Sequence, residues 1–383
     1  MWETMKNSEV CAFFEDELLT VVDKVGNVRF VDWTGRDRQS VPESERICPE
    51  PSLKRIKHKA LPVGDEVWVL TANPHQGMSG GQMQLVRLDQ ELQELDRQDL
   101  YPLDQKLDYV YAGLQRDYSP HHLLTATRYF HVSFVPRDEV GTNWGHELEK
   151  GVPYLYLFWK DLPSGTEEEW ELDIADIYNR YHVVPELFLN VEVALANDDF
   201  VWLLVDLATD RGMRHALLQV NVRRHFSWMI WVSDEDGSSG GEPRILDTER
   251  FIQWGFAYRG EVGRPKEERY LPRSLPLVAR SLEDYALLLP EERFWLEYPV
   301  AWPQEVLAWN GRICMQNRGI AFWSQYPTGE TSDNWHIVQD EKAVCEGLWQ
   351  GQLIFRYPNG GLVALEAQLD EPEELRWLWD PEY

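Results

Sequence analysis

The sequence predicts an all-β fold, and three properties of its 383 residues predict it. Its apolar segments are short, rich in Val, Leu, Ile, Trp and Tyr, and often alternate with polar residues, which is the pattern of half-buried strands. Gly, Pro, Asn and Asp separate these segments, as turns require. With 43% hydrophobic and 13% aromatic residues the chain can bury a large core, which excludes disorder despite its charge.

The first predicted unit is a hairpin of residues 17–22 and 28–33, since Gly26-Asn27 suits a tight turn. The second unit has strands at 66–72 and 82–88 around a glycine-rich loop. Residues 91–100 supply its third strand, or residues 90–97 form a helical turn instead.

Five further groups of strand patterns follow along the chain. Their predicted strands are 123–135, 154–162 and 170–174; 191–196, 200–206 and 215–222; 228–233, 244–246 and 252–258; 306–309, 312–316, 319–324 and 336–338; and 343–349, 352–357 and 361–367. The chain therefore holds about seven groups of about 55 residues each.

The layout of strand, loop, strand ending in Leu88-Asp89, turn and strand resembles a β-propeller blade. Closing such units into a ring protects the open edges that many short antiparallel strands would leave. We therefore predict one β-propeller of six or seven blades over residues 1–383, with a closing blade that the N-terminal and C-terminal strands can share. The alternative is a pair of β-rich domains.

The net charge of the chain is −28, from 65 acidic and 37 basic residues. This charge repels phosphate backbones, so nucleic acid is excluded as a partner, whereas it steers a basic protein toward the chain. Alternatively, the acidity only keeps an aromatic-rich protein soluble.

No apolar run approaches the ~18 residues of a membrane helix, so we expect no membrane span. The N-terminal residues lack a basic leader, which favours a cytoplasmic location. The four cysteines are scattered and suit packing in a reducing compartment.

Gly77-Met78-Ser79-Gly80-Gly81 satisfies G-x-S-x-G, the motif that exposes a catalytic serine at a strand-to-helix turn. Here a loop precedes Ser79 and a strand pattern follows it, so we interpret the segment as a hairpin loop. Ser79 stays the only catalytic candidate, for a serine hydrolase.

The histidines His121, His122 and His131 lie close in sequence but lack a recognised ligand spacing. We interpret the adjacent pair as surface or capping residues after Pro120. No metal site and no cofactor motif is predicted.

Acidic loops beside aromatic residues are the candidate protein-binding site, because they combine charge steering with aromatic anchors. The candidates are Asp198, Asp199, Trp228, Trp231, Asp234, Glu235 and Asp236. An acidic, aromatic-rich chain without a catalytic motif is similar in character to bacterial immunity proteins. That resemblance implies an inhibitor of a basic toxin or effector.

Two alternatives remain open. The first is a constitutive interaction scaffold. The second is a hydrolase, either a serine enzyme or a carbohydrate-active enzyme that uses the many paired carboxylates of the chain.

Overall fold

The structure, a computed structural model, describes the parts of the chain given in the next sentence. These are residues 8–13, 17–22, 27–32, 37–40, 59–74, 81–103, 121–134, 136–139, 154–172, 185–209, 212–232, 243–245, 250–253, 273–276, 305–309, 312–316, 320–323, 335–338, 344–349, 352–356, 362–365 and 376–379.

Seven antiparallel sheets make up the described part of the chain, and each consists of consecutive strands. The first sheet contains β1 (Ser8–Phe13), β2 (Glu17–Val22), β3 (Asn27–Asp32) and β4 (Asp37–Ser40). The second contains β5 (Lys59–Val63), β6 (Glu66–Pro74), β7 (Gly81–Leu88) and β8 (Glu94–Leu103). The third contains β9 (His122–Leu124), β10 (Arg128–Ser133), β11 (Tyr156–Asp161) and β12 (Glu167–Glu171), with the 3₁₀ helix η4 (Arg137–Glu139) after β10.

The remaining four sheets follow in the same order. The fourth contains β13 (Pro185–Ala196), β14 (Phe200–Thr209), β15 (Gly212–Asn221) and β16 (Phe226–Val232). The fifth contains β17 (Pro243–Ile245), β18 (Arg250–Gln253) and β19 (Arg273–Pro276). The sixth contains β20 (Glu305–Trp309), β21 (Arg312–Gln316), β22 (Ile320–Trp323) and β23 (Trp335–Val338). The seventh contains β24 (Val344–Trp349), β25 (Gln352–Arg356), β26 (Leu362–Leu365) and β27 (Arg376–Trp379).

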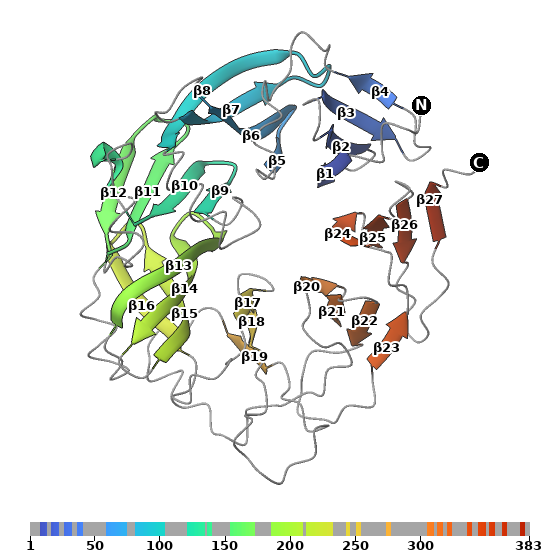
Figure 1. Ribbon diagram of the computed structural model, residues 1–383. Helices are drawn as coiled ribbons and strands as arrows, with labels where there is room; N and C mark the ends of the chain where they lie inside the picture. Colours follow the sequence, from blue (N-terminus) through green and yellow to red (C-terminus); the bar gives the residue numbers. More distant parts are fainter. Residues whose placement is uncertain are drawn as a thin grey trace.

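The sheets are arranged in a ring, with the first strand of each nearest the centre (Figure 1). Neighbouring inner strands touch, as in β1 with β5 and β9 with β13. Contact between β1 and β24 brings the two ends of the ring together. The protein is therefore a β-propeller, with seven blades among the described residues, which confirms the predicted fold class.

The expected sharing of a closing blade has no counterpart among the described strands. The first sheet takes all its strands from the N-terminal end of the chain, and the seventh takes all of its strands from the C-terminal end. The contact between β1 and β24 joins the described parts of these two sheets. Because residues 1–7 and 380–383 lie outside the described residues, a shared closing blade stays a prediction.

Two predicted strand assignments needed correction. Residues 123–135 form two strands, because the hydroxyl of Thr125 accepts a hydrogen bond from the backbone N–H of Arg128 and closes a turn between them. The segment that starts at Trp228 belongs to the fourth sheet as β16, paired with β15, and does not begin the fifth.

Side-chain alternation explains why these segments form stacked sheets. On β10, Phe130 and Val132 face the fourth sheet, whereas Tyr129 faces the second. On β14, Val201, Trp202 and Leu203 are all buried, so this strand is covered on both faces.

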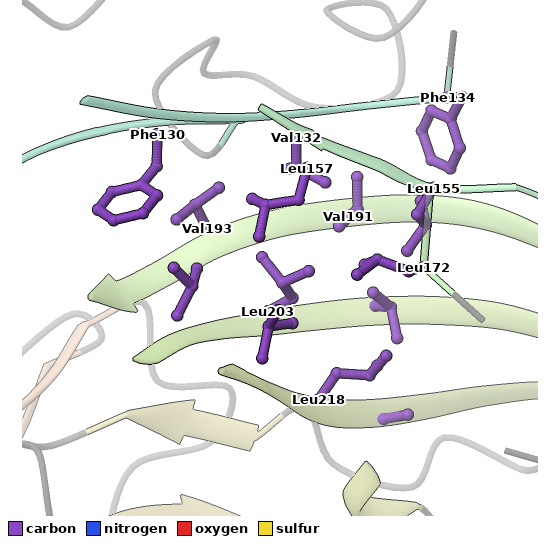
Figure 2. Packing of buried hydrophobic residues seen from close by; sticks show 14 of the residues in the cluster. Phe130, Val132, Phe134, Leu155, Leu157, Leu172, Val191, Val193, Leu203 and Leu218 are labelled. Atoms are coloured by element: carbon purple, nitrogen blue, oxygen red, sulfur yellow. The ribbon is translucent and has the colours of Figure 1, made fainter. Parts of the chain in front are cut away.

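The largest described core cluster lies between the third and fourth sheets (Figure 2). Phe130 and Leu157 from the third sheet face Val193, Leu203 and Leu218 from the fourth. A smaller cluster between the second and third sheets includes Leu85, Leu100 and Phe158. The third sheet is therefore packed on both of its faces, which holds this blade in place.

Candidate functional site: an acidic and aromatic edge of the third sheet

Several predicted site residues lie outside the described residues or only on described backbone. Ser79 and the acidic run Asp234, Glu235 and Asp236 lie outside the described residues. Trp228 and Trp231 belong to β16, the outer strand of the fourth sheet.

Asp198 and Asp199 form the turn between β13 and β14 and are engaged by residues of this chain. The Asp198 carboxylate accepts a hydrogen bond from the Thr127 hydroxyl at 3.1 Å, and its backbone carbonyl accepts one from Arg128 at 2.7 Å. Asp199 forms an ion pair with Arg223 at 2.7 Å. The Asp198 contacts tie the fourth sheet to the third, and the Arg223 ion pair within the fourth sheet neutralises part of the charge that was predicted to steer a partner.

The Asp198–Asp199 turn and the last residue of β16 lie at different places along the fourth sheet. Phe200, next to the acidic turn, pairs with Asn221 at one end of β15. Val232, the last residue of β16, pairs with Ala216 in the middle of β15. The Asp198–Asp199 turn therefore lies beside one end of β15, and β16 runs away from that end.

The outer strand of the third sheet carries a concentrated acidic surface instead. β12 has the sequence Glu-Glu-Glu-Trp-Glu, and every position except the partly buried Trp170 is exposed. It hydrogen-bonds only to β11 among the described strands. The turn before it is ordered by Asp161, whose carboxylate accepts hydrogen bonds from the N–H and hydroxyl of Ser164, and by Gly165 at a φ of +71°.

Two cations support the start of this strand. The buried Lys160 forms a 2.8 Å ion pair with Glu167 and donates to the backbone carbonyl of Asp99 in the second sheet at 3.3 Å. The guanidinium of Arg137 also pairs with Glu167. Burial alone raises the pKa of Glu167, but the bonds from Lys160 and Arg137 outweigh it and lower that pKa.

The carboxylate of Glu169 has fewer compensating partners than that of Glu167. Its carboxylate accepts a 2.8 Å hydrogen bond from the backbone N–H of Arg137. Burial, together with the nearby negative charge of Asp138, nevertheless raises its pKa. Ionising Glu169 therefore costs more free energy than ionising an ordinary glutamate, and a cation bound beside it would reduce that cost.

Tyrosines lie beside these carboxylates. Tyr156 pairs across the strands with Glu171, and Tyr154 just before it is 48% exposed. Burial and the carboxylates of Glu171 and Glu139 raise the pKa of Tyr156. We call the set the acidic–aromatic edge, and its members are Asp138, Glu139, Tyr154, Tyr156, Glu169 and Glu171.

Sequence reasoning missed this edge, because it treated the many paired carboxylates of the chain as one undivided set. Acidic pairs are too common in this chain for one to stand out. The available signal was an acidic strand directly after a Gly165 turn, but η4 and Tyr154 join it only through tertiary structure.

The adjacent histidines that were predicted to be surface or capping residues are buried: His121 is 9% exposed and His122 is 3% exposed. His131, on the neighbouring strand β10, is 7% exposed. The rings of His122 and His131 stack with centroids 4.3 Å apart, and Tyr101 lies 3.9 Å from the His131 ring. The prediction was wrong because β9 is the inner strand of its sheet, a placement that local sequence does not reveal.

Within the ranges that the structure describes, no three side chains from His, Cys, Asp and Glu are arranged to hold a metal ion. The same ranges contain no helix with the length and apolar character to cross a membrane.

Neither known protein families nor curated proteins match this sequence. The structure is similar to the β-propeller domain of the trilobed protease from Pyrococcus furiosus, with a TM-score of 0.50, 8% identity, and coverage of 98% of this chain and 96% of that one. It is also similar to an oligogalacturonate lyase in complex with manganese, with a TM-score of 0.51, 11% identity, and coverage of 94% and 86%. These similarities support the propeller fold alone.

Proposed function

We propose that this protein is a binding module that captures a basic segment of another protein on its acidic–aromatic edge. The observation that carries the proposal is the gathering of four carboxylates and two tyrosines on one edge, with Glu169 and Tyr156 both raised in pKa. A docked lysine or arginine would relieve the crowded negative charge and contact the exposed ring of Tyr154.

The scaffold suits such a role because it holds the edge rigidly. β11 lies between β10 and β12, and its residues Leu157, Phe158 and Trp159 are buried against the neighbouring sheets. A rigid surface loses little conformational entropy when a partner binds. The net charge of −28 adds long-range attraction for a basic partner, which salt weakens.

The specific form that we propose is a cytoplasmic immunity or inhibitor protein that neutralises a basic toxin or effector. The acidity and the exposed Tyr154 support it, since charge steering speeds capture and an aromatic anchor slows release. A constitutive scaffold would instead form complexes that resist salt, so the salt dependence of the complex separates these two forms.

The test compares two variants of equal charge. Glu169→Gln with Glu171→Gln removes two carboxylates from the edge, and Asp65→Asn with Asp96→Asn removes two from the second sheet. The probes are an arginine-rich peptide and any protein captured from the source cell at low salt. We expect the edge variant to weaken binding roughly tenfold and the control to change it less than twofold. Equal losses of affinity in both variants would show that binding depends on net charge alone and would refute the edge as the site.

Tyr154→Ala tests the aromatic contribution separately. We expect faster dissociation with little change in association rate, because the ring contributes short-range contact and no charge. Unchanged dissociation would remove Tyr154 from the site.

Binding should also depend on pH through Glu169. Because burial raises its pKa, this carboxylate gains protons earlier than an ordinary glutamate as pH falls, and a protonated group attracts no cation. Affinity should therefore fall as pH is lowered from about 7 toward about 5, and less so in Glu169→Gln.

A further inference from the structure

β12 is the outer strand of the third sheet, and the hydrogen bonds around it show which of its backbone groups point outward. The N–H of Asp161 donates to the carbonyl of Thr166, and the N–H of Leu172 donates to the carbonyl of Leu155, each at 2.9 Å. Hydrogen-bonded pairs recur at every second residue of an antiparallel ladder, so the backbone groups of even-numbered residues from 166 to 172 point toward β11. The N–H and C=O groups of the odd-numbered residues therefore point away from the sheet. These residues are Glu167, Glu169 and Glu171.

The other side of β11 agrees with this alternation. The N–H of Leu162 donates to the carbonyl of Thr127 at 2.9 Å, so the even-numbered residues of β11 bond to β10 and its odd-numbered residues bond to β12. Within the part of the chain that the structure describes, no strand pairs with the outer side of β12. All three outward-directed glutamates are exposed. Their backbone groups can therefore accept a further strand.

β12 also has a more regular edge than most of the other outer strands. Its ladder with β11 runs without a bulge. In contrast, β4, β8, β16 and β27 each pair with the neighbouring strand across a register shift, and β19 ends in Pro276. Such irregularities hinder pairing with another chain. β23 is regular too, but it carries no acidic residue, so among the described outer strands β12 alone combines a regular edge with a row of carboxylates.

The side chains of β12 define what a further strand must carry. Glu169 and Glu171 lie on one face, and Glu167 on the same face already pairs with two cations of this chain. Trp170 lies on the opposite face, where it packs against the core cluster of the third and fourth sheets. A second copy of β12 would place carboxylates opposite carboxylates, which destabilises a strand pair, whereas lysine or arginine at those positions stabilises it. The edge therefore favours a basic strand over a copy of itself.

We propose that β12 binds an extended segment of a partner protein as an additional antiparallel strand, with a basic residue opposite each of Glu169 and Glu171 and an apolar residue opposite Trp170. The partner motif is thus basic, apolar, basic. Main-chain hydrogen bonds contribute affinity, and the alternate side chains contribute specificity. The inference rests on the proposed function, because it uses the same acidic–aromatic edge, and it adds the conformation and the residue spacing of the partner.

Backbone methylation of a synthetic peptide tests these hydrogen bonds without altering charge. The probe is the acetylated and amidated peptide Thr-Val-Lys-Val-Arg-Val-Thr, titrated against the full chain and followed by fluorescence anisotropy. One analogue carries N-methyl groups on the amides of its lysine and arginine, which would point toward β12. The matched control carries them on the amides of the two valines that follow these residues, which would point to solvent. We expect the first analogue to bind about tenfold more weakly than the unmethylated peptide, and the control to lose less than about threefold.

Hydrogen exchange locates the bound strand on the protein. In the free protein the outward amides of residues 167, 169 and 171 have no described strand beside them. A saturating concentration of the unmethylated peptide should therefore slow exchange in the segment 166–172 about tenfold. β14 is the internal control, because it already lies between β13 and β15, and its exchange should not change. Protection that appears elsewhere but not in this segment would overturn the proposal.

A proline variant tests the same hydrogen bonds from the side of the protein. Glu169→Pro removes an outward N–H and no hydrogen bond of the ladder with β11, while Glu169→Gln removes the same charge and keeps the N–H. Glu169→Pro should bind the unmethylated peptide about fivefold more weakly than Glu169→Gln. Equal affinities of the two folded variants would contradict strand addition. The methylated peptides use the wild-type protein, so they decide the question even if the proline variant does not fold.

The failure of this inference differs from the failure of the proposed function. Strand addition is overturned if the two methylation patterns weaken binding equally while the variant with Glu169→Gln and Glu171→Gln still loses about tenfold. The edge would then bind cations without adding a strand. If that double variant binds the unmethylated peptide as tightly as the wild type, the proposed function itself is refuted.

Discussion

Truncating Leu203 tests the packing between the third and fourth blades. Its side chain is 0% exposed and lies in the cluster that both sheets share, as Figure 2 shows. Leu203→Ala removes about 2.4 kcal/mol of transfer free energy, at ~0.8 kcal/mol for each of three carbon groups. The cavity that remains adds to this loss, so we expect a total of about 3 to 4 kcal/mol. Leu95→Ala is the control, because Leu95 is 52% exposed and its loss should cost less than about 0.5 kcal/mol.

The assay is urea unfolding followed by tryptophan fluorescence. With an m-value of about 3 kcal/mol/M, Leu203→Ala should lower the midpoint by about 1 M and leave the slope unchanged. The variant should still fold, since domains have about 5 to 15 kcal/mol of stability. A loss below about 1 kcal/mol, or an equal loss in Leu95→Ala, would refute the tight packing of these two blades.

Three further predictions concern single side chains. Glu66 accepts bonds from Arg87 at 2.7 and 2.6 Å, which lower its pKa, so Glu66→Gln should cost about 1 kcal/mol at pH 7. This cost should shrink as pH falls below the ordinary pKa of glutamate and disappear only below the lowered pKa of Glu66, where the wild-type carboxyl is protonated too, so the two pH-dependent unfolding curves should converge there. Gly165→Ala should lower stability by about 1 kcal/mol in thermal unfolding, because its φ of +71° strains any residue with a side chain. Asp199→Ser should change stability by less than about 1 kcal/mol and leave association with a basic partner unchanged, since Asp199 is occupied by Arg223, and a slower association would instead return it to the site.

Much of the fold followed from local patterns. The predicted hairpin of residues 17–22 and 28–33 corresponds to β2 and β3, and the second unit corresponds to β6, β7 and β8. The choice between a strand and a helical turn at 91–100 is settled in favour of the strand β8. These elements were predictable because period-two alternation and turn residues act over a few positions.

The grouping of strands into sheets was harder to predict at the boundary between the fourth and fifth sheets. β16 carries apolar residues that fit either the end of the fourth sheet or the start of the fifth, and only its pairing with β15 decides between them. Strand pairing is a non-local property, because the hydrogen bonds join segments whose separation in sequence the pattern does not encode.

The candidate site shows the same division. The sequence by itself determined that the protein is acidic, aromatic-rich and made of short antiparallel strands, since these properties are sums over residues or repeats over a few positions. Only the tertiary structure decided that Glu169 and Tyr154 share an edge, that Asp198 serves the contact between two blades, and that His122 and His131 are buried. Burial and charge compensation depend on which strand of a blade is innermost and which neighbour covers it, and ring closure sets both.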